Sequence, residues 1–387
     1  MSNAPKYNLD LDQFWHDPYP DLKAMRQIGP VVFVPQLNAN LFTRRDDIFV
    51  HEKKIEIYSS VQPGGLMTRL MGQNMMRKDG AAHRRERKNI FPTISPKTVA
   101  DQWQAVFMQR ATEVVADVAP MGELDLANHL AKRLAGQALI AITGLASMSW
   151  QDMDRVSQAM IDGIANFAGD PAVEARCIAC TGEIEAHIDD MAKAADQPYP
   201  FSLLAVLLRA GVERDEIYAN IKLAISGGQN ETRDVIAGLV WALLTHPQQL
   251  EQVKAGELSW QQAFDEYVRW ISPIGMSPRR VAQPYRVGDV DLEPDEVVFF
   301  MFGSANRDER VFDQPDSYKV GRDCTPAIAF GAGPHFCAGA WAAKCFIAQA
   351  AVPEIFARLR GLRLSQQTKF GGWAFRGPLE MPVQWDV

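Results

Sequence analysis

Several features that would point to particular classes of protein are missing from this sequence. No uninterrupted apolar stretch approaches the ~20 residues that cross a bilayer, and the first twenty residues have neither the basic start nor the apolar run of a signal peptide. We therefore expect no membrane association and a cytoplasmic location. The net charge of −7 argues against a nucleic-acid partner, because a surface for nucleic acid would need a clustered excess of lysine and arginine.

Cysteine is also scarce, with five residues in 387. An odd number of thiols fits a reducing compartment with free thiols better than a disulfide framework. The chain has no repeat of fixed period, no Gly/Ser linker and no charge run that would mark a boundary. A chain of this length could form two domains or one large one, and these absences favour a single domain over residues 1–387.

The spacing of the apolar residues predicts a mainly α fold with small β-sheets. Most of residues 83–270 shows helical spacing with polar breaks. Residues 30–55 predict two short strands around an Asn-rich turn, followed by a helix. Residues 277–301 alternate apolar and polar side chains and predict further strands. The sheets are therefore expected to be small and scattered among helices.

The longest helical pattern covers residues 214–245 and contains SGGQNETRD, residues 226–234, at its centre. Each glycine in a helix interior costs about 1 kcal/mol relative to alanine, so the interruption needs a reason. One explanation is a kink that allows another element to pack closely. The other is that something flat approaches the backbone here and that Glu231 and Thr232 face it.

A second unusual segment is FGAGPHFCAG, residues 330–339, where three glycines and one cysteine precede a helical run. Such a loop can wrap closely around a thiolate, and backbone amides that point at the sulfur lower its pKa. One cysteine without a partner at C-x-x-C spacing is wrong for a structural zinc site, which takes four ligands. It suits an iron whose other ligands come from a macrocycle.

This loop resembles the haem-binding loop of the cytochrome P450 superfamily, and other segments match the family in the expected order. The matching residues are Phe330, Gly331, Gly333, His335, Cys337 and Gly339 in the loop, His83 and Arg87 in DGAAHRRERKNIF, the pair Glu231 and Thr232, the Glu-x-x-Arg pair Glu266 and Arg269, and Arg322 at the end of SANRDERVFDQPDSYKVGR. Alone, a Glu-x-x-Arg pair is often a solvated helical ion pair, and a basic run is often an exposed face. Together these segments cover essentially the whole chain and imply the α-rich fold of a bacterial soluble P450.

The resemblance implies haem b, iron protoporphyrin IX, with the Cys337 thiolate as its axial metal ligand. The implied cofactor-binding residues are His83, Arg87, Gly228, Arg279, Phe330, His335, Cys337 and Gly339. Among them, His83, Arg87, Arg279 and His335 are the expected partners of the haem propionates. Arg279 rather than Arg280 is the expected propionate partner, because its distance in sequence to the following strand fits the family pattern better. Glu266, Arg269 and Arg322 are the expected members of a buried structural network.

The family also implies an enzyme, a monooxygenase that activates O2 with electrons from a ferredoxin or flavodoxin and an NAD(P)H-dependent reductase. In this role Thr232 and Glu231 are the catalytic residues, because they would deliver protons during oxygen activation. Gln229 departs from the family pattern, which usually has glycine two positions before the acid. Two other functions stay open, a peroxide-driven haem-thiolate peroxygenase and a haem-based gas sensor.

The substrate pocket implied by the resemblance is apolar and aromatic. Such a lining predicts a small hydrophobic or aromatic substrate. Its expected residues are Ala224, Ile225, Ile274, Trp373 and Phe375. The turn KFGGWAFRGP, residues 369–378, looks similar to bacterial members that remove methyl groups from methoxylated aromatics. We therefore expect hydroxylation or O-dealkylation.

Two further features invite interpretation. Cys177 and Cys180 have C-x-x-C spacing, but without a second pair they are interpreted as two buried small side chains rather than as zinc ligands. Pro353 interrupts the helical pattern that follows the cysteine loop, so we expect that helix to kink or stop there.

Overall fold

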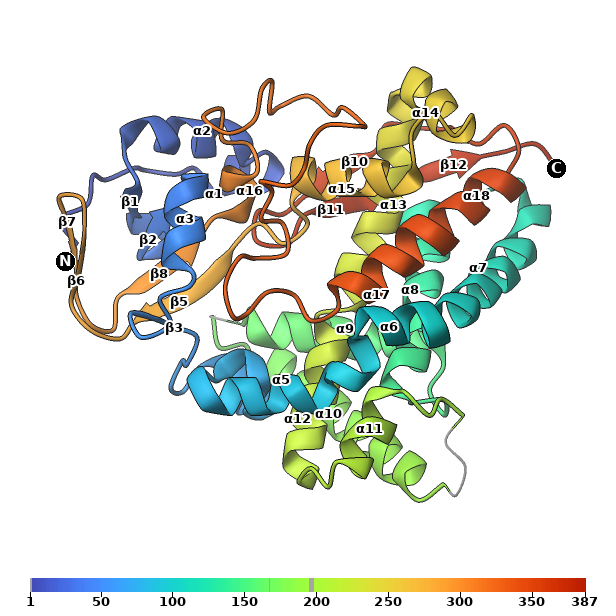
Figure 1. The fold of residues 1–387 in the computed structure, drawn as a ribbon, viewed down its shortest axis with the longest axis horizontal. Coiled ribbons are helices and arrows are strands. Elements are labelled where there is room, and N and C mark those ends of the chain that lie inside the picture. Colours follow the sequence, from blue (N-terminus) through green and yellow to red (C-terminus); the bar gives the residue numbers. More distant parts are fainter. Residues whose placement is uncertain (1, 167, 195–197) are drawn as a thin grey trace. The chain divides into compact units, whose positions relative to one another are not determined.

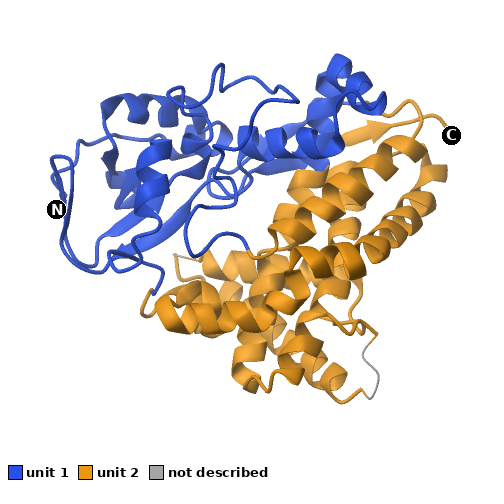
Figure 2. Ribbon diagram, in the orientation of Figure 1, with its two compact units in different colours: residues 1–61, 237–337, 364–381 blue, residues 62–236, 338–363, 382–387 orange. Residues whose placement is uncertain are grey.

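The computed structural model describes residues 2–166, 168–194 and 198–387. The chain forms two compact units, each assembled from separate stretches of sequence (Figure 2). Unit 1 comprises residues 1–61, 237–337 and 364–381, and unit 2 comprises residues 62–236, 338–363 and 382–387. Neither unit therefore corresponds to one half of the sequence.

Unit 1 contains a five-stranded sheet with the strand order β1-β2-β8-β5-β3 (Figure 1). Strands β2 and β8 are parallel, and the other neighbouring pairs are antiparallel. Asn38 ends the turn between β1 and β2 with a φ of 46°, a left-handed conformation that asparagine tolerates. The strands of this sheet are β1 Val31–Val34, β2 Ala39–Phe42, β3 Tyr58–Ser59, β5 Ser277–Val281 and β8 Val297–Phe300.

Two hairpins and several helices complete unit 1. The hairpins are β6 Tyr285–Val287 with β7 Val290–Leu292, and β10 Lys369–Gly371 with β11 Gly377–Glu380. The helices are α1 Leu11–His16, α2 Tyr19–Ile28, α3 Arg45–His51, α14 Pro247–Lys254, α15 Trp260–Ile271 and α16 Phe302–Ala305. The strands predicted in residues 30–55 and 277–301 are thus confirmed, as is the helix that follows the first pair.

Unit 2 is mostly helical. Its helices are α4 Leu66–Met71, α5 Gly80–Ile94, α6 Pro96–Thr98, α7 Gln104–Val118, α8 Lys132–Thr143, α9 Trp150–Ile164, α10 Pro171–Ala192, α11 Leu203–Arg209 and α12 Arg214–Ser226, with π-helical turns at Val99–Trp103 and Leu126–Ala131. The short strands β4 Glu123–Asp125 and β12 Pro382–Gln384 pair antiparallel, and β9 spans Arg363–Leu364. Among the described residues, no helix is long and apolar enough to cross a membrane. The predicted mainly α fold with small sheets is confirmed.

The helical pattern over residues 214–245 forms two helices, α12 and α13 Gln229–Thr245, so the prediction of one long helix is wrong. Gly227 and Gly228 separate the two helices. A Cβ atom on Gly228 would lie 2.6 Å from the carbonyl oxygen of Ala224 and 2.7 Å from Cδ2 of Leu139. Close packing at this break therefore requires glycine, which supports the first explanation without excluding the second.

The segment after the cysteine loop continues as helix beyond Pro353. It runs from α17 Ala340–Lys344 through a π-helical stretch, Cys345–Ala351, into α18 Val352–Arg358 (Figure 1). Of the two expected outcomes, a kink or a stop, the stop at Pro353 is therefore wrong, and the helix is irregular just before the proline. Since a π-helix bonds residues five apart, its wider turns just before Pro353 give room for a ring that would clash with the i−4 carbonyl in a regular α-helix.

Candidate active site

The cysteine loop, residues 330–339, closes on itself and leaves Cys337 exposed. The backbone amide of Cys337 donates to the carbonyl of Phe330 over 2.9 Å. Gly331 has a φ of 81°, in the left-handed region that strains other residues. The Phe330 ring stacks on Phe264 of α15 with 6.3 Å between the ring centroids. Of the five cysteines, Cys337 is exposed, whereas the others are buried or half-buried.

Glu52, which follows α3 directly, supports this loop from a distant part of the sequence. Its Oε2 accepts a hydrogen bond from the backbone amide of Ala332 over 2.7 Å. Its Oε1 lies 3.5 Å from Nη2 of Arg279 on β5. Burial raises the pKa of Glu52, and the charge of Arg279 and the Ala332 amide act against this rise. Sequence reasoning missed Glu52, because nothing in its local sequence signals a contact with the cysteine loop.

The two candidate arginines of β5 lie in different surroundings, because successive side chains of a strand point to opposite faces. Arg279 is buried and pairs with Glu52, whereas Arg280 is half-buried and pairs with Asp295 near the surface, with 2.6 Å between Nη1 and Oδ1. This alternation supports the choice of Arg279 as the residue that would face a buried anionic group.

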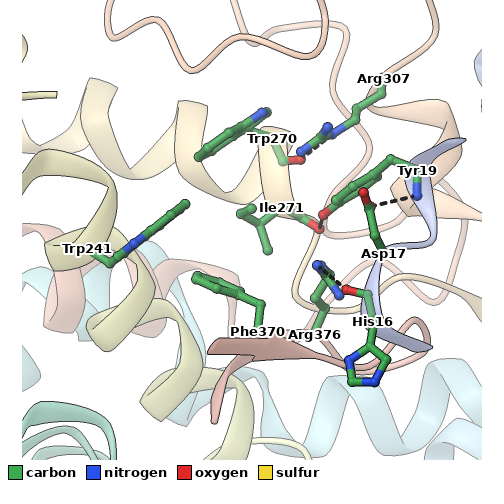
Figure 3. Close-up of a pocket in the computed structure, with 9 residues that line it drawn as sticks. All are labelled: His16, Asp17, Tyr19, Trp241, Trp270, Ile271, Arg307, Phe370 and Arg376. Atoms are coloured by element: carbon green, nitrogen blue, oxygen red, sulfur yellow. Dashed lines mark hydrogen bonds between the residues drawn. The ribbon is translucent and has the colours of Figure 1, made fainter. Parts of the chain in front are cut away.

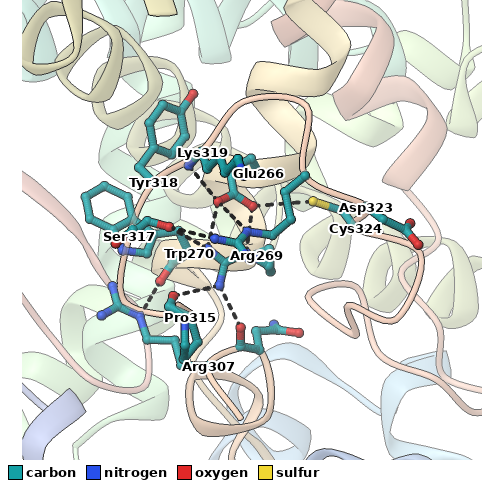
Figure 4. A network of polar contacts seen from close by, with 12 residues as sticks. Glu266, Arg269, Trp270, Arg307, Pro315, Ser317, Tyr318, Lys319, Asp323 and Cys324 are labelled. Atoms are coloured by element: carbon teal, nitrogen blue, oxygen red, sulfur yellow. Dashed lines mark hydrogen bonds and ion pairs between the residues drawn. The ribbon is translucent and has the colours of Figure 1, made fainter. Parts of the chain in front are cut away.

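Glu266 and Arg269 form the centre of a buried polar network in unit 1 (Figure 4). The capping box of Ser259 and Gln262 begins α15, and the i,i+3 spacing of Glu266 and Arg269 places both side chains on one face of this helix. Two parallel bonds join the pair, with 2.7 Å and 2.8 Å between the guanidinium nitrogens and the carboxylate oxygens. Arg322 Nε adds a third contact to the carboxylate at 3.0 Å. The structure thus brings the three predicted network residues together.

Arg269 also fixes the segment that leads towards the cysteine loop. Its Nη1 donates to the carbonyls of Asn306 and Pro315, both over 2.9 Å, and the amide of Lys319 donates to Glu266 over 2.8 Å. Cys324 Sγ lies 3.5 Å from the same carboxylate, and burial together with that charge raises the pKa of the thiol to about 12. The network therefore holds residues 306–324 in place through backbone groups.

In unit 2, His83 and Arg87 lie one turn apart on α5, and His83 is buried. Glu86, also buried, forms an ion pair with Lys78 and accepts a hydrogen bond from Nδ2 of Asn220 over 2.9 Å. Since Asn220 belongs to α12, these contacts fix α5 against that helix. The two predicted haem-binding side chains are therefore carried by an anchored helix.

The first turn of α13 contains a carboxyl group with an unusual environment. Glu231 is half-buried as a residue, but its Oε2 is buried and has no hydrogen-bond partner among the described residues. Burial raises its pKa to about 7. Thr232 beside it is half-buried. Gln229, which departs from the family pattern, donates to the carbonyl of Lys132 and to Asp154, both over 3.1 Å, and so occupies a position anchored to α8 and α9.

The predicted substrate-pocket residues lie in both units. In unit 1, Ile274 and Phe375 form a β-bridge, Phe375 is exposed, and Trp373 lies 5.4 Å from the Phe14 ring between centroids. In unit 2, Ala224 is half-buried, whereas Ile225 is completely buried in the hydrophobic core. Ile225 therefore has no exposed surface to offer in this structure.

A separate pocket of about 360 Å³, largely open to solvent, is formed by residues of unit 1 (Figure 3). It is lined by His16, Asp17, Tyr19, Trp241, Trp270, Ile271, Arg307, Phe370 and Arg376. Arg307 donates to the carbonyl of Trp270 over 2.7 Å, and Arg376 donates to the carbonyl of His16 over 3.0 Å. None of the predicted substrate-pocket residues lines it, so this cavity is distinct from the predicted pocket.

Cys177 and Cys180 are both buried on α10, and burial raises the pKa of Cys177 to about 11. Within the described ranges, no three His, Cys, Asp or Glu side chains are grouped closely enough to hold a metal ion. The two thiols lie among the apolar residues of the unit 2 core.

The chemistry of the predicted site residues fits a haem. Cys337 supplies an accessible soft ligand, and Arg279 is a buried cation suited to a propionate. Glu231 has a buried carboxyl oxygen without a partner in the described part of the chain, whereas the glycine at position 228 is already required by its contacts with Ala224 and Leu139. A Cβ atom on Gly339 would meet no atom within 4 Å, so the protein itself does not require glycine there.

Comparisons with known proteins agree with this chemistry. Residues 260–350 match the family model described as Cytochrome P450. The chain is 23% identical to pulcherriminic acid synthase of Bacillus subtilis over 100% of both chains, and 28% identical to cytochrome P450 107B1 of Saccharopolyspora erythraea over 81% of this chain and 78% of the relative. The crystal structure of CalO2 has the same fold, with a TM-score of 0.87, 24% identity and coverage of 97% of both chains. The chain is therefore similar along its length to members of the cytochrome P450 family, which carry haem with a cysteine thiolate ligand.

Proposed function

We propose that this P450 takes electrons from a separate ferredoxin or flavodoxin with an NAD(P)H-dependent reductase, and hydroxylates or O-dealkylates a small hydrophobic substrate, including aromatic ones. The observation that carries the proposal is the accessible thiol of Cys337 on a loop closed by the Phe330 carbonyl. Cys337 would be the ligand of a haem b iron, and the residues that would contact the haem or its propionates are His83, Arg87, Gly228, Arg279, Phe330, His335 and Gly339. When bound, the haem supplies the metal at which O2 is activated, with electron density donated by the thiolate.

Glu231 and Thr232 would bind and transfer protons in this reaction. A carboxyl group with a pKa of about 7 is protonated in part of the molecules at neutral pH, so it can accept and release protons without a large cost. Thr232, the next residue, would pass the proton on through its hydroxyl group. The acid-alcohol pair favours a monooxygenase over a peroxide-driven enzyme, which has no need for this delivery.

Replacing Thr232 by alanine tests that role. Thr232→Ala should bind haem normally but divert reducing equivalents into hydrogen peroxide, because the proton needed for productive O–O cleavage arrives late. The measurement is peroxide released per NAD(P)H consumed. Thr143→Ala is the control, since it removes a buried helical hydroxyl group that bonds the carbonyls of Leu139 over 2.6 Å and Ile140 over 3.5 Å within its own helix. Equal coupling in the two variants would assign proton delivery to another group.

The electron donor would bind a basic face that includes Arg84 and Lys88, which are exposed on α5. An acidic ferredoxin would be attracted to such a face despite the net negative charge of the whole chain. Raising the salt concentration should slow reduction by the donor, because salt screens this attraction. A reduction rate that does not change with salt would contradict this docking face.

Three measurements separate the candidate functions. Product formed with NAD(P)H, a surrogate ferredoxin and its reductase supports the monooxygenase, whereas product formed only with added peroxide supports the peroxygenase. Spectral response to diatomic gases without product from any substrate supports the gas sensor. A screen of small aromatic compounds, including methoxylated ones, for a change in haem spin state would identify the substrate class.

A further inference from the structure

The loop that carries Cys337 is held by more than its own backbone bonds. Glu52 Oε2 accepts the amide hydrogen of Ala332 over 2.7 Å, although 280 residues separate the two in sequence. Both residues belong to unit 1. The Glu52 side chain is only 2% exposed, so water cannot readily replace it as the acceptor for this amide.

The glycines of the loop lie directly on Glu52. A Cβ atom on Gly333 would lie 2.6 Å from the backbone oxygen of Glu52, closer than real Cβ contacts allow. A Cβ atom on Gly331 would lie 3.1 Å from Glu52 Oε1. Two of the three loop glycines are therefore explained by the approach of this one residue, and not only by turn conformation.

The other carboxylate oxygen of Glu52 faces β5. Oε1 forms an ion pair with Nη2 of Arg279 over 3.5 Å, and the Arg279 side chain is 4% exposed. Arg279 Nη1 is in turn bonded to the carbonyl of Pro278 over 2.8 Å. One buried carboxylate thus connects the cysteine loop with the arginine that would bind a propionate.

We propose that Glu52 is a positioning residue for the cysteine ligand: its carboxylate fixes the amide of Ala332 in the loop while it is itself held by Arg279. The hydrogen bond keeps the loop in the conformation that presents the Cys337 thiolate, and the ion pair keeps the carboxylate from turning away. The part of this inference that concerns ligation rests on the proposed role of Cys337, whereas the part that concerns loop order does not.

Hydrogen exchange in the haem-free protein tests loop order on its own. Glu52→Ala should make the amide of Ala332 exchange about tenfold faster or more, because a buried amide loses a charged acceptor. Glu52→Gln keeps an acceptor oxygen of the same reach but loses the charge that pairs with Arg279, so exchange should rise less than in Glu52→Ala, by about threefold or less. Unchanged exchange in Glu52→Ala would overturn the proposal whatever the protein binds.

The ligation part is tested on the haem-loaded protein. In Glu52→Ala, the fraction of the reduced carbonyl complex with the thiolate-ligated absorption band should fall to about half or less during mild heating, while Glu52→Gln should retain it. If Ala332 exchanges faster in Glu52→Ala but the thiolate band is retained, the loop is held by Glu52 without any effect on ligation, and the proposal is wrong. If the parent protein itself shows no thiolate band, the assignment of Cys337 fails instead.

Asp308 provides a matched control at the other end of α3. It is also buried, with 1% exposure, and its Oδ2 accepts the backbone amide of Arg45 over 3.0 Å. It is paired with Arg310 over 3.2 Å. Asp308→Ala should lower stability without changing Ala332 exchange or the thiolate band. If Asp308→Ala and Glu52→Ala changed Ala332 exchange and the thiolate band equally, Glu52 would only stabilise the fold in general. This result would refute a positioning role.

Gly333→Ala tests the same contact from the loop side. Because its Cβ atom would lie 2.6 Å from the Glu52 backbone oxygen, this variant should separate the loop from Glu52 and reproduce both effects of Glu52→Ala. The double variant should then be no worse than either single variant, since both changes remove one contact. Additive losses in the double variant would contradict the shared contact.

Discussion

Replacing Glu266 by glutamine should reveal how strongly the buried network of unit 1 depends on charge. Glu266 and Arg269 are both 0% exposed, and two nitrogen–oxygen contacts of 2.7 Å and 2.8 Å join them. Glutamine has nearly the same shape but no charge. In Glu266→Gln, the guanidinium group of Arg269 therefore remains buried without an anionic partner in that pair.

The expected cost is large because the remaining cation cannot reach water. Breaking one side of a buried ion pair costs about 3–5 kcal/mol of the free energy of unfolding, far more than the few tenths for an exposed helical pair. Arg269 also bonds the carbonyls of Asn306 and Pro315, so its displacement should loosen that segment as well. Removing both charges, in Glu266→Gln with Arg269→Gln, should cost less than the sum of the two single changes.

A double-mutant cycle measured by urea-induced unfolding of the full chain tests this reasoning. We expect a coupling energy of about 2 kcal/mol or more between Glu266 and Arg269. The control is Asp152 and Arg155, which have the same i,i+3 order and a contact of 3.1 Å but are 40% and 48% exposed. Their coupling should stay below about 0.5 kcal/mol. Similar coupling energies for the two pairs would refute the claim that burial makes this network strong.

Three further results are expected. Gly238→Ala should destabilise the protein by about 3 kcal/mol in urea unfolding, since its Cβ atom would lie 1.6 Å from the hydroxyl oxygen of the buried Tyr267. The control Gly182→Ala should stabilise α10 slightly, because its Cβ atom would meet no atom within 4 Å. Equal effects of the two substitutions would contradict the packing argument. Burial and the charge of Lys54 lower the pKa of His51 from 6.5 to about 4. As the pH falls, the unfolded state therefore binds a proton at His51 before the folded state does. The urea midpoint should thus fall as the pH drops from 6.5 towards 4. His51→Leu should flatten this acid limb, and an unchanged pH profile would show that other groups produce it. Because the pKa of Glu231 is raised to about 7, turnover should show an inflection near pH 7 that disappears in Glu231→Gln, and its persistence in that variant would assign the titration to another group.

Local spacing in the sequence was sufficient for the features whose partners are near neighbours along the chain. The i,i+3 spacing of Glu266 and Arg269 placed both side chains on one face of a helix, and the structure joins them. Gly227 and Gly228 marked a real interruption, although it separates two helices rather than bending one. The strands in residues 30–55 followed from the Asn-rich turn between them, and those in residues 277–301 followed from alternation and turn signals.

Tertiary structure decided what depends on contacts between remote segments. Glu52 has no local signal, because its partners Ala332 and Arg279 come from other parts of the chain and contact it only in the folded unit 1. The burial of Arg279 rather than Arg280 is likewise a matter of which face of β5 is covered. The helix continues past Pro353 because a preceding π-helical stretch accommodates the ring. Propensity and spacing act over a few residues, whereas burial and long-range hydrogen bonds are set by the packing of the whole unit.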